Sequence, residues 1–205
     1  MFELFQHSLS VFLAFLAIMN PIANTAVFVS LTGKEDRSFQ ITIATRALII
    51  SFFIILVFAI LGKTIFHLFG ISLPALRIAG GVLVFIVGYQ MLHGKSSSMH
   101  KPQETHDSDI SVSPLAVPIL AGPGTIATAM NYSATGQLIE IIITVVTFGI
   151  LCMVTFLSFI FGQKIVDFIG ESGLSIVTRL MGLILSVIGT QMLIIGAFGA
   201  IKAFG

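Results

Sequence analysis

The residues of this chain that could bind a polar solute gather at two breaks in otherwise apolar sequence. The first break is Asn20-Pro21, and the second is the run Gly122-Pro123-Gly124. A proline inside a helix removes a backbone hydrogen-bond donor and clashes with the preceding turn, at a cost of about 3 kcal/mol. In the hydrocarbon of a bilayer, the freed backbone groups are tolerated only beside protein or a water-filled cavity.

Each break also predicts the start of a half-helix. Asn is a favoured N-cap and Pro is favoured at the first helical position, so half-helices are expected from Pro21 and from Pro123. Glycine allows close backbone approach at the second break. Two helix N-termini that point into the protein favour an anionic group such as an α-carboxylate. The residues expected to bind such a solute are Asn20, Pro21, Asn24, Thr25, Gly122, Pro123, Gly124, Thr125, Thr128 and Asn131. The alternative is that the prolines only kink transmembrane helices.

Two arginines lie about one turn inside apolar segments, at Arg77 and Arg179. An arginine at the centre of a membrane helix costs at least about 2.5 kcal/mol, so each needs an explanation. We expect them to support the solute carboxylate or to act as gates. The alternative is snorkelling, in which the side chain reaches the nearer membrane interface.

The sequence offers no pattern for catalysis or for a resident cofactor. There is no HExxH motif, no nucleotide-binding loop and no acidic cluster for metal-dependent chemistry. The single cysteine, Cys152, sits in an apolar run and fits a small buried side chain. A formal net charge of +1 gives no reason to expect a nucleic-acid partner. We therefore expect no enzyme, no metal site and no cofactor.

The elements that must position these residues are membrane-spanning helices. The chain has 205 residues, of which 56% are apolar and only 9% charged. Soluble domains carry about 25% charged residues, so the class is an all-α integral membrane protein. Six segments reach the roughly 17–25 residues that a spanning helix needs. They are 9–31, 43–66, 73–93, 114–133, 138–161 and 174–198.

A polar linker, 94–113, divides the chain into an N-terminal half, 1–93, and a C-terminal half, 114–205. Basic residues concentrate on the cytoplasmic side of a membrane protein. The linker side carries Lys34, Arg37, Arg46, Lys95, Lys101, Lys164 and Arg179, whereas the other side carries Lys63, Arg77 and Lys202. The linker is therefore expected in the cytoplasm and both termini in the periplasm.

The two halves repeat one order of features. Residues 69–92 align with 169–193, and Gly81 and Gly88 correspond to Gly182 and Gly189. Each half has three expected spans, an odd number, so the second half enters the membrane from the opposite side. The sequence thus predicts two inverted three-helix repeats, with the first and fourth helices broken. Many transporters have this plan, with the solute bound where broken helices meet.

Several motifs in fixed order resemble the MarC family of bacterial inner-membrane proteins. They are Asn-Pro at 20–21, Phe-Gly-Ile-Ser-x-Pro-x-Leu-Arg-Ile-Ala-Gly-Gly at 69–81, Pro-Leu-Ala-x-Pro at 114–118, Ala-Gly-Pro-Gly-Thr-Ile-Ala at 121–127 and Arg-Leu-Met-Gly at 179–182. The resemblance implies six spans, extracytoplasmic termini and a fold distantly similar to LysE-type amino-acid exporters. The family includes a small neutral amino-acid transporter.

These observations together favour a secondary transporter of small neutral amino acids, such as glycine or alanine, that works by alternating access. The expected partners are the lipid bilayer and the small-molecule solute, and the oligomeric state stays open. Three alternatives also stay open: a membrane scaffold or assembly protein, a transporter of another small or drug-like solute, and a passive channel.

Overall fold

The computed structural model describes residues 2–33, 35–93, 120–134 and 137–204, which are almost entirely helical. The linker 94–113 lies outside these residues. So does most of the segment upstream of the second break. The helices are α1 (Phe2–Met19), α2 (Pro21–Thr32), α3 (Arg37–Phe69), α4 (Leu73–Leu92), α5 (Pro123–Tyr132), α6 (Leu138–Ile160) and α7 (Gly162–Phe204).

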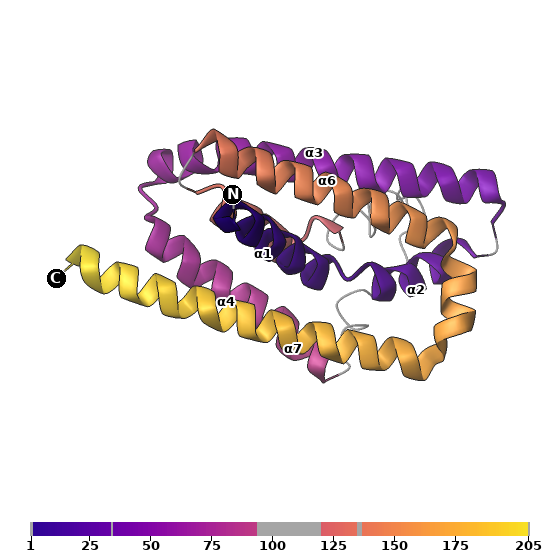
Figure 1. The fold of residues 1–205 in the computed structure, drawn as a ribbon. Coiled ribbons are helices and arrows are strands. Elements are labelled where there is room, and N and C mark those ends of the chain that lie inside the picture. The colour runs from indigo at the N-terminus through magenta and orange to yellow at the C-terminus, as the bar shows by residue number, and fades with distance from the viewer. Residues whose placement is uncertain (1, 34, 94–119, 135–136, 205) are drawn as a thin grey trace.

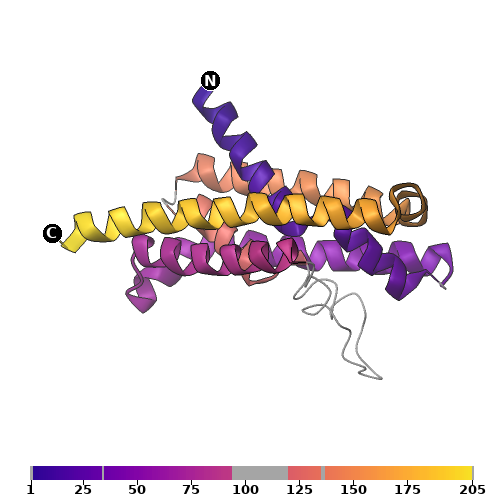
Figure 2. The ribbon, with the colours of Figure 1, turned by 90° about the horizontal axis from the view of Figure 1, so that it is seen from below.

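The described helices form three layers (Figure 1). The long helices α3 and α6 lie side by side in one outer layer, and α4 and α7 form the other. The broken pair α1–α2 lies between these layers, together with the short helix α5. Figure 2, turned by 90°, shows α1 leaning away from the α4–α7 pair at its N-terminal end. The two breaks therefore lie between the two outer layers.

Aromatic side chains fix the middle layer against α6. The rings of Phe15 and Phe148 meet edge to face at 5.1 Å, and those of Phe28 and Phe159 stack at 4.4 Å. All four side chains are almost fully buried, and such pairs contribute about 0.5–1.5 kcal/mol beyond the area they bury. Since Phe15 belongs to α1 and Phe28 to α2, α6 holds both halves of the broken helix.

Glycines bring α4 and α7 into close contact along the second outer layer. A Cβ atom added to Gly81 would lie 2.8 Å from the carbonyl oxygen of Gly189, and one added to Gly88 would lie 2.7 Å from that of Gly182. Any larger side chain would push the two backbones apart. The seven-residue glycine spacing in the sequence is therefore a packing stripe, as small residues are in other membrane helix pairs.

Two glycines with left-handed backbone turn the chain between the outer layers. Gly70 has φ 63° and joins α3 to α4, whereas Gly170 has φ 65° and ψ 170° within α7. The first segment of α7 crosses from α6 toward α4, and the second runs beside α4 (Figure 1). The sequence predicted a connection over 162–173, but the backbone there is helical except at Gly170.

Five described helical segments are long and apolar enough to cross a membrane: Leu4–Thr32, Arg37–Gly62, Leu73–Leu92, Leu138–Ile160 and Ser172–Lys202. They correspond to five of the six expected spans. The remaining expectation, 114–133, falls partly outside the described residues. Large apolar side chains cover the outward faces, including Phe53 and Met153, which are more than half exposed. The all-helical membrane class is thus confirmed for the described part of the chain.

Candidate functional site

The first break lies in the buried centre of the molecule. Helix α1 ends at Met19 and α2 begins at Pro21, as the sequence predicted. Between them, Asn20 has the left-handed backbone angles φ 37° and ψ 71°, which Asn tolerates better than most residues. Its side chain is only 4% exposed, and its Oδ1 accepts a hydrogen bond of 3.3 Å from the Ala23 backbone amide. Asn20 is thus the predicted N-cap of the half-helix.

The side chains of two other polar residues of the first break donate hydrogen bonds to backbone carbonyl oxygens there. The Asn24 amide nitrogen donates to the Met19 carbonyl oxygen, and the Thr25 hydroxyl donates to that of Pro21 at 2.7 Å. The Met19 carbonyl, at the end of α1, is one that the interruption would leave without an intrahelical donor. The Pro21 carbonyl lies in the first turn of α2, so the Thr25 bond is an additional one there. The Nδ2 atom of Asn20, in contrast, is buried and has no hydrogen-bond partner among the described residues. It is the free donor at this break.

The second break lies next to the first. Helix α5 begins at Pro123. Its N-cap residue, Gly122, has an extended backbone and no side chain to accept a capping hydrogen bond. Gly122 and Gly124 are buried, whereas the Pro123 ring is exposed. A Cβ atom added to Gly124 would lie 4.0 Å from Cγ2 of Ile18, near the end of α1. The structure therefore brings the starts of the two half-helices into one region.

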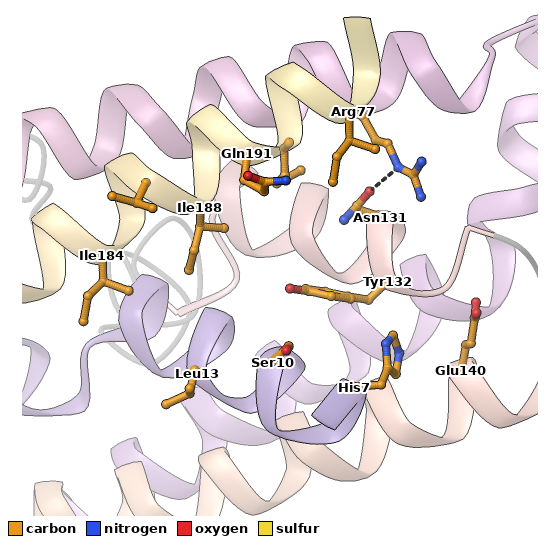
Figure 3. Close-up of a pocket in the computed structure, with 13 residues that line it drawn as sticks. His7, Ser10, Leu13, Arg77, Asn131, Tyr132, Glu140, Ile184, Ile188 and Gln191 are labelled. Carbon is orange, nitrogen blue, oxygen red and sulfur yellow. Dashed lines mark hydrogen bonds between the residues drawn. The ribbon is translucent and has the colours of Figure 1, made fainter. Parts of the chain in front are cut away.

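The polar face of α5 continues from this break toward the other end of the helix. Thr125 and Thr128 are fully buried, and Oγ1 of Thr128 has no partner among the described residues. At the end of the helix, Oδ1 of Asn131 accepts a hydrogen bond of 3.1 Å from Nε of Arg77 (Figure 3). The predicted α5 residues and the first predicted arginine thus belong to one connected region.

A cavity of about 550 Å³ opens at this end of α5, and we call it the outer cavity. Arg77, Asn131, His7, Tyr132, Glu140 and Gln191 bring polar groups to it, and aliphatic side chains of α7 form one wall (Figure 3). The His7 and Tyr132 rings meet edge to face at 5.8 Å, and Nε2 of His7 is buried without a partner among the described residues. The volume is within the range of small-molecule sites.

Arg179, the second predicted arginine, has a different environment. It is exposed, and it borders a smaller hollow of about 430 Å³ with Ser172, Ser175 and Ile176. This hollow lies near the start of the second segment of α7, whereas the outer cavity contacts its later turns. The structure therefore does not bring the two arginines together.

Sequence reasoning missed several residues of the outer cavity, among them His7, Tyr132 and Glu140. His7 is in α1, and Glu140 is in the first turn of α6. None of them belongs to a motif, and only the packing of α1 against α5 and α6 gathers them. Among the described residues, no group of three or more His, Cys, Asp or Glu side chains is arranged to hold a metal ion.

Comparison with known proteins decides the family. The description "MarC family integral membrane protein" matches residues 5–201, nearly the entire chain. The chain belongs to the MarC family. It is 39% identical to the UPF0056 membrane protein YvbG of Bacillus subtilis, over 96% of both chains. A UPF0056 membrane protein of Pyrococcus horikoshii is 36% identical over 98% of both chains. No solved structure matches.

Family membership agrees with the apolar helices, and the resemblance predicted from the sequence motifs is confirmed. The protein is an integral membrane protein with several spans. In this chain, the breaks and the outer cavity described above are the features that could serve a solute.

Proposed function

We propose that this MarC protein is a secondary transporter of a small neutral amino acid, such as glycine or alanine, and works by alternating access. One observation carries the proposal: the free Nδ2 donor of Asn20 is buried at a helix break, beside the start of a second half-helix. A buried donor without an acceptor costs about 1–3 kcal/mol, and such groups recur where a ligand or water completes the bonding.

The chemistry of this region matches a carboxylate. The first amides of a helix have no intrahelical acceptor and carry partial positive charge, which favours an anion. In the proposed complex, the solute carboxylate lies at the starts of α2 and α5 and accepts a hydrogen bond from Asn20. Asn24 and Thr25 then stabilise the break without touching the solute, because their hydrogen bonds go to the backbone.

An inverted repeat would supply the two alternating states. Three features support it. Gly81 contacts Gly189 and Gly88 contacts Gly182, so exchanging each glycine for its repeat partner turns one contact into the other. Helix α2 packs on α6 and α7, while α5 packs on α3 and α4, the corresponding helices of the other half. Gly70 and Gly170 share a left-handed backbone at corresponding positions.

The hollows beside Arg77 and Arg179 fit the entrances of such a transporter. In the described state, Arg77 is hydrogen bonded to α5, whereas Arg179 is exposed. The Arg77–Asn131 bond ties α4 to α5 at the outer cavity, and its breakage would let these helices separate. The proposed gate thus alternates between the two ends of the molecule as one repeat rocks against the other.

Thermal stabilisation tests the binding part of this proposal. A ligand that binds the native state raises its stability, by about 2.7 kcal/mol at one hundred times the dissociation constant. We expect glycine or alanine to raise the unfolding temperature of the purified protein in detergent, and Asn20→Gly to abolish the shift. Glycine keeps the left-handed backbone without strain.

Ser72→Gly is the matched control. It removes another side-chain N-cap, since Ser72 Oγ accepts from the Ala75 amide at 3.3 Å at the start of α4, which is not a break. This variant should keep the full ligand shift. A scaffold or assembly protein, the alternative function, predicts no shift with any amino acid in either protein.

A further inference from the structure

The contacts of α1 fix its register against the two helices beside it. On the α5 side, His7 meets Tyr132 and Ile18 lies near Gly124, so the two helices run antiparallel. On the α6 side, Phe15 meets Phe148 and the Met19 sulfur lies 3.6 Å from the Thr155 hydroxyl, so these helices run parallel. The depth of a residue on α5 or α6 can therefore be read against α1.

Two buried threonines lie at about the same depth by this reading. Thr128 is midway between Gly124 and Tyr132, which places it roughly level with residues 12 and 13 of α1, at equal rise per residue. Thr144 precedes Phe148 by one helical turn, which places it roughly level with Val11. One hydroxyl comes from α5 and the other from α6, and both helices flank α1.

Neither hydroxyl makes the bond that several other threonines of the described helices make. The hydroxyls of Thr25, Thr32 and Thr155 each donate to the carbonyl oxygen four residues earlier, at 2.7–2.9 Å. Thr128 and Thr144 are fully buried, and neither Oγ1 has a hydrogen-bond partner among the described residues. A buried hydroxyl that does not donate to the carbonyl oxygen four residues earlier is a group whose hydrogen bond water or a ligand can complete.

Four unpartnered polar groups are therefore ordered along α1. Nε2 of His7 lies at the outer cavity, the Thr128 and Thr144 hydroxyls lie at mid-depth, and Nδ2 of Asn20 lies at the break. Two small buried side chains of α1, Ala14 and Ala17, lie between the level of the threonines and the break. The arrangement provides hydrogen-bonding groups at successive depths between the cavity and the break.

We propose that Thr128 and Thr144 form a transit site for the polar end of a small zwitterionic solute, on a route that runs along α1 between α5 and α6. This inference rests on the proposed function and adds the path by which the solute reaches the breaks. A hydroxyl both donates and accepts, so the pair can serve the carboxylate, the ammonium group or the water that accompanies them.

Thiol modification tests the route without relying on transport. Cysteine would replace Thr128 or Thr144 in a Cys152→Ala background, and the purified protein in detergent would react with a charged, water-soluble methanethiosulfonate. Thr32→Cys is the control, because Thr32 is equally buried but its hydroxyl is bonded to the Phe28 carbonyl. We expect both test thiols to react at least about tenfold faster than the control thiol. Free alanine added as the solute should slow the reaction of both test thiols. Rates equal to that of the control would overturn the route.

Valine replacements supply the second readout. Thr128→Val and Thr144→Val keep the side-chain shape and should each lower the transport rate by about tenfold, whereas Thr32→Val should not. If the wild type transports the amino acid and both Val variants transport it at the same rate, the transit site is overturned and the proposed function stands. Fast thiol modification in a protein that transports no amino acid would overturn the function and leave a water-accessible route.

Discussion

At the scale of single residues, the polar side chains near the breaks divide by what they bond to. The side chains of Asn24 and Thr25 both donate to backbone carbonyls beside the break, and the Asn24 bond satisfies the carbonyl at the end of α1. Asn20 and Thr128 keep a polar atom that has no partner among the described residues. The first kind explains how the chain tolerates the break, and we propose that the second kind binds the solute.

The two arginines provide a matched residue-scale prediction. Arg77→Lys removes the Nε–H that donates to Asn131, and lysine does not reproduce this geometry. Hydrogen bonds to charged groups contribute about 1.5–3 kcal/mol, so this variant should unfold at a lower temperature than the wild type. Arg179→Lys should unfold at the wild-type temperature, because Arg179 is exposed. Equal shifts of the unfolding temperature for both variants would contradict a stabilising Arg77–Asn131 hydrogen bond between α4 and α5.

The candidate site was only partly predictable at this scale. The Asn-Pro and Gly-Pro-Gly motifs identify the breaks because their effects on the backbone are local. That Asn131 meets Arg77 depends on the packing of α4 against α5, which no spacing along the chain reveals. His7 and Glu140 stand near the starts of their helices and have no distinguishing motif, so their place in the outer cavity follows only from the fold.

At the scale of elements, the glycine stripe between α4 and α7 gives a sharp packing prediction. A methyl group at position 88 would lie 2.5 Å from the Ser186 amide nitrogen, which is rigid backbone. Gly88→Ala should therefore destabilise the protein by about 1–3 kcal/mol, the usual cost of overpacking. Thermal or denaturant unfolding in detergent measures this change.

Gly62→Ala is the control for helix propensity. A methyl group there would meet only Met130, at 3.7 Å or more, which is ordinary contact. This variant should be as stable as the wild type or slightly more stable, since alanine favours helix by about 1 kcal/mol over glycine. If Gly88→Ala were as stable as Gly62→Ala, the close approach of α4 and α7 at position 88 would be contradicted.

The elements themselves were largely predictable. The proline after Asn20 separates α1 from α2, and the apolar runs give the long helices, because both effects depend on nearby residues. The connection around Gly170 was not predicted as helix. Its polar and glycine residues resemble a loop in composition, yet one left-handed glycine suffices to redirect the chain while helix continues on both sides.

At the scale of the whole molecule, the orientation in the membrane follows from the distribution of basic residues rather than from packing. We predict periplasmic termini and a cytoplasmic 94–113 linker in the inner membrane of a bacterial host. Alkaline phosphatase fused to the C-terminus should be active, and green fluorescent protein fused there should be dark. A fluorescent fusion with inactive phosphatase would reverse the orientation and place the outer cavity on the cytoplasmic side.

The central claim is that the helix breaks bind a solute that the protein carries across the membrane. Counterflow of labelled glycine and alanine into proteoliposomes tests it most directly. We predict transient accumulation with the wild type and with Ser72→Gly, and none with a folded Asn20→Gly variant. Accumulation by Asn20→Gly at the wild-type rate would contradict the binding site, and no accumulation by the wild type with any amino acid would contradict the proposed transport.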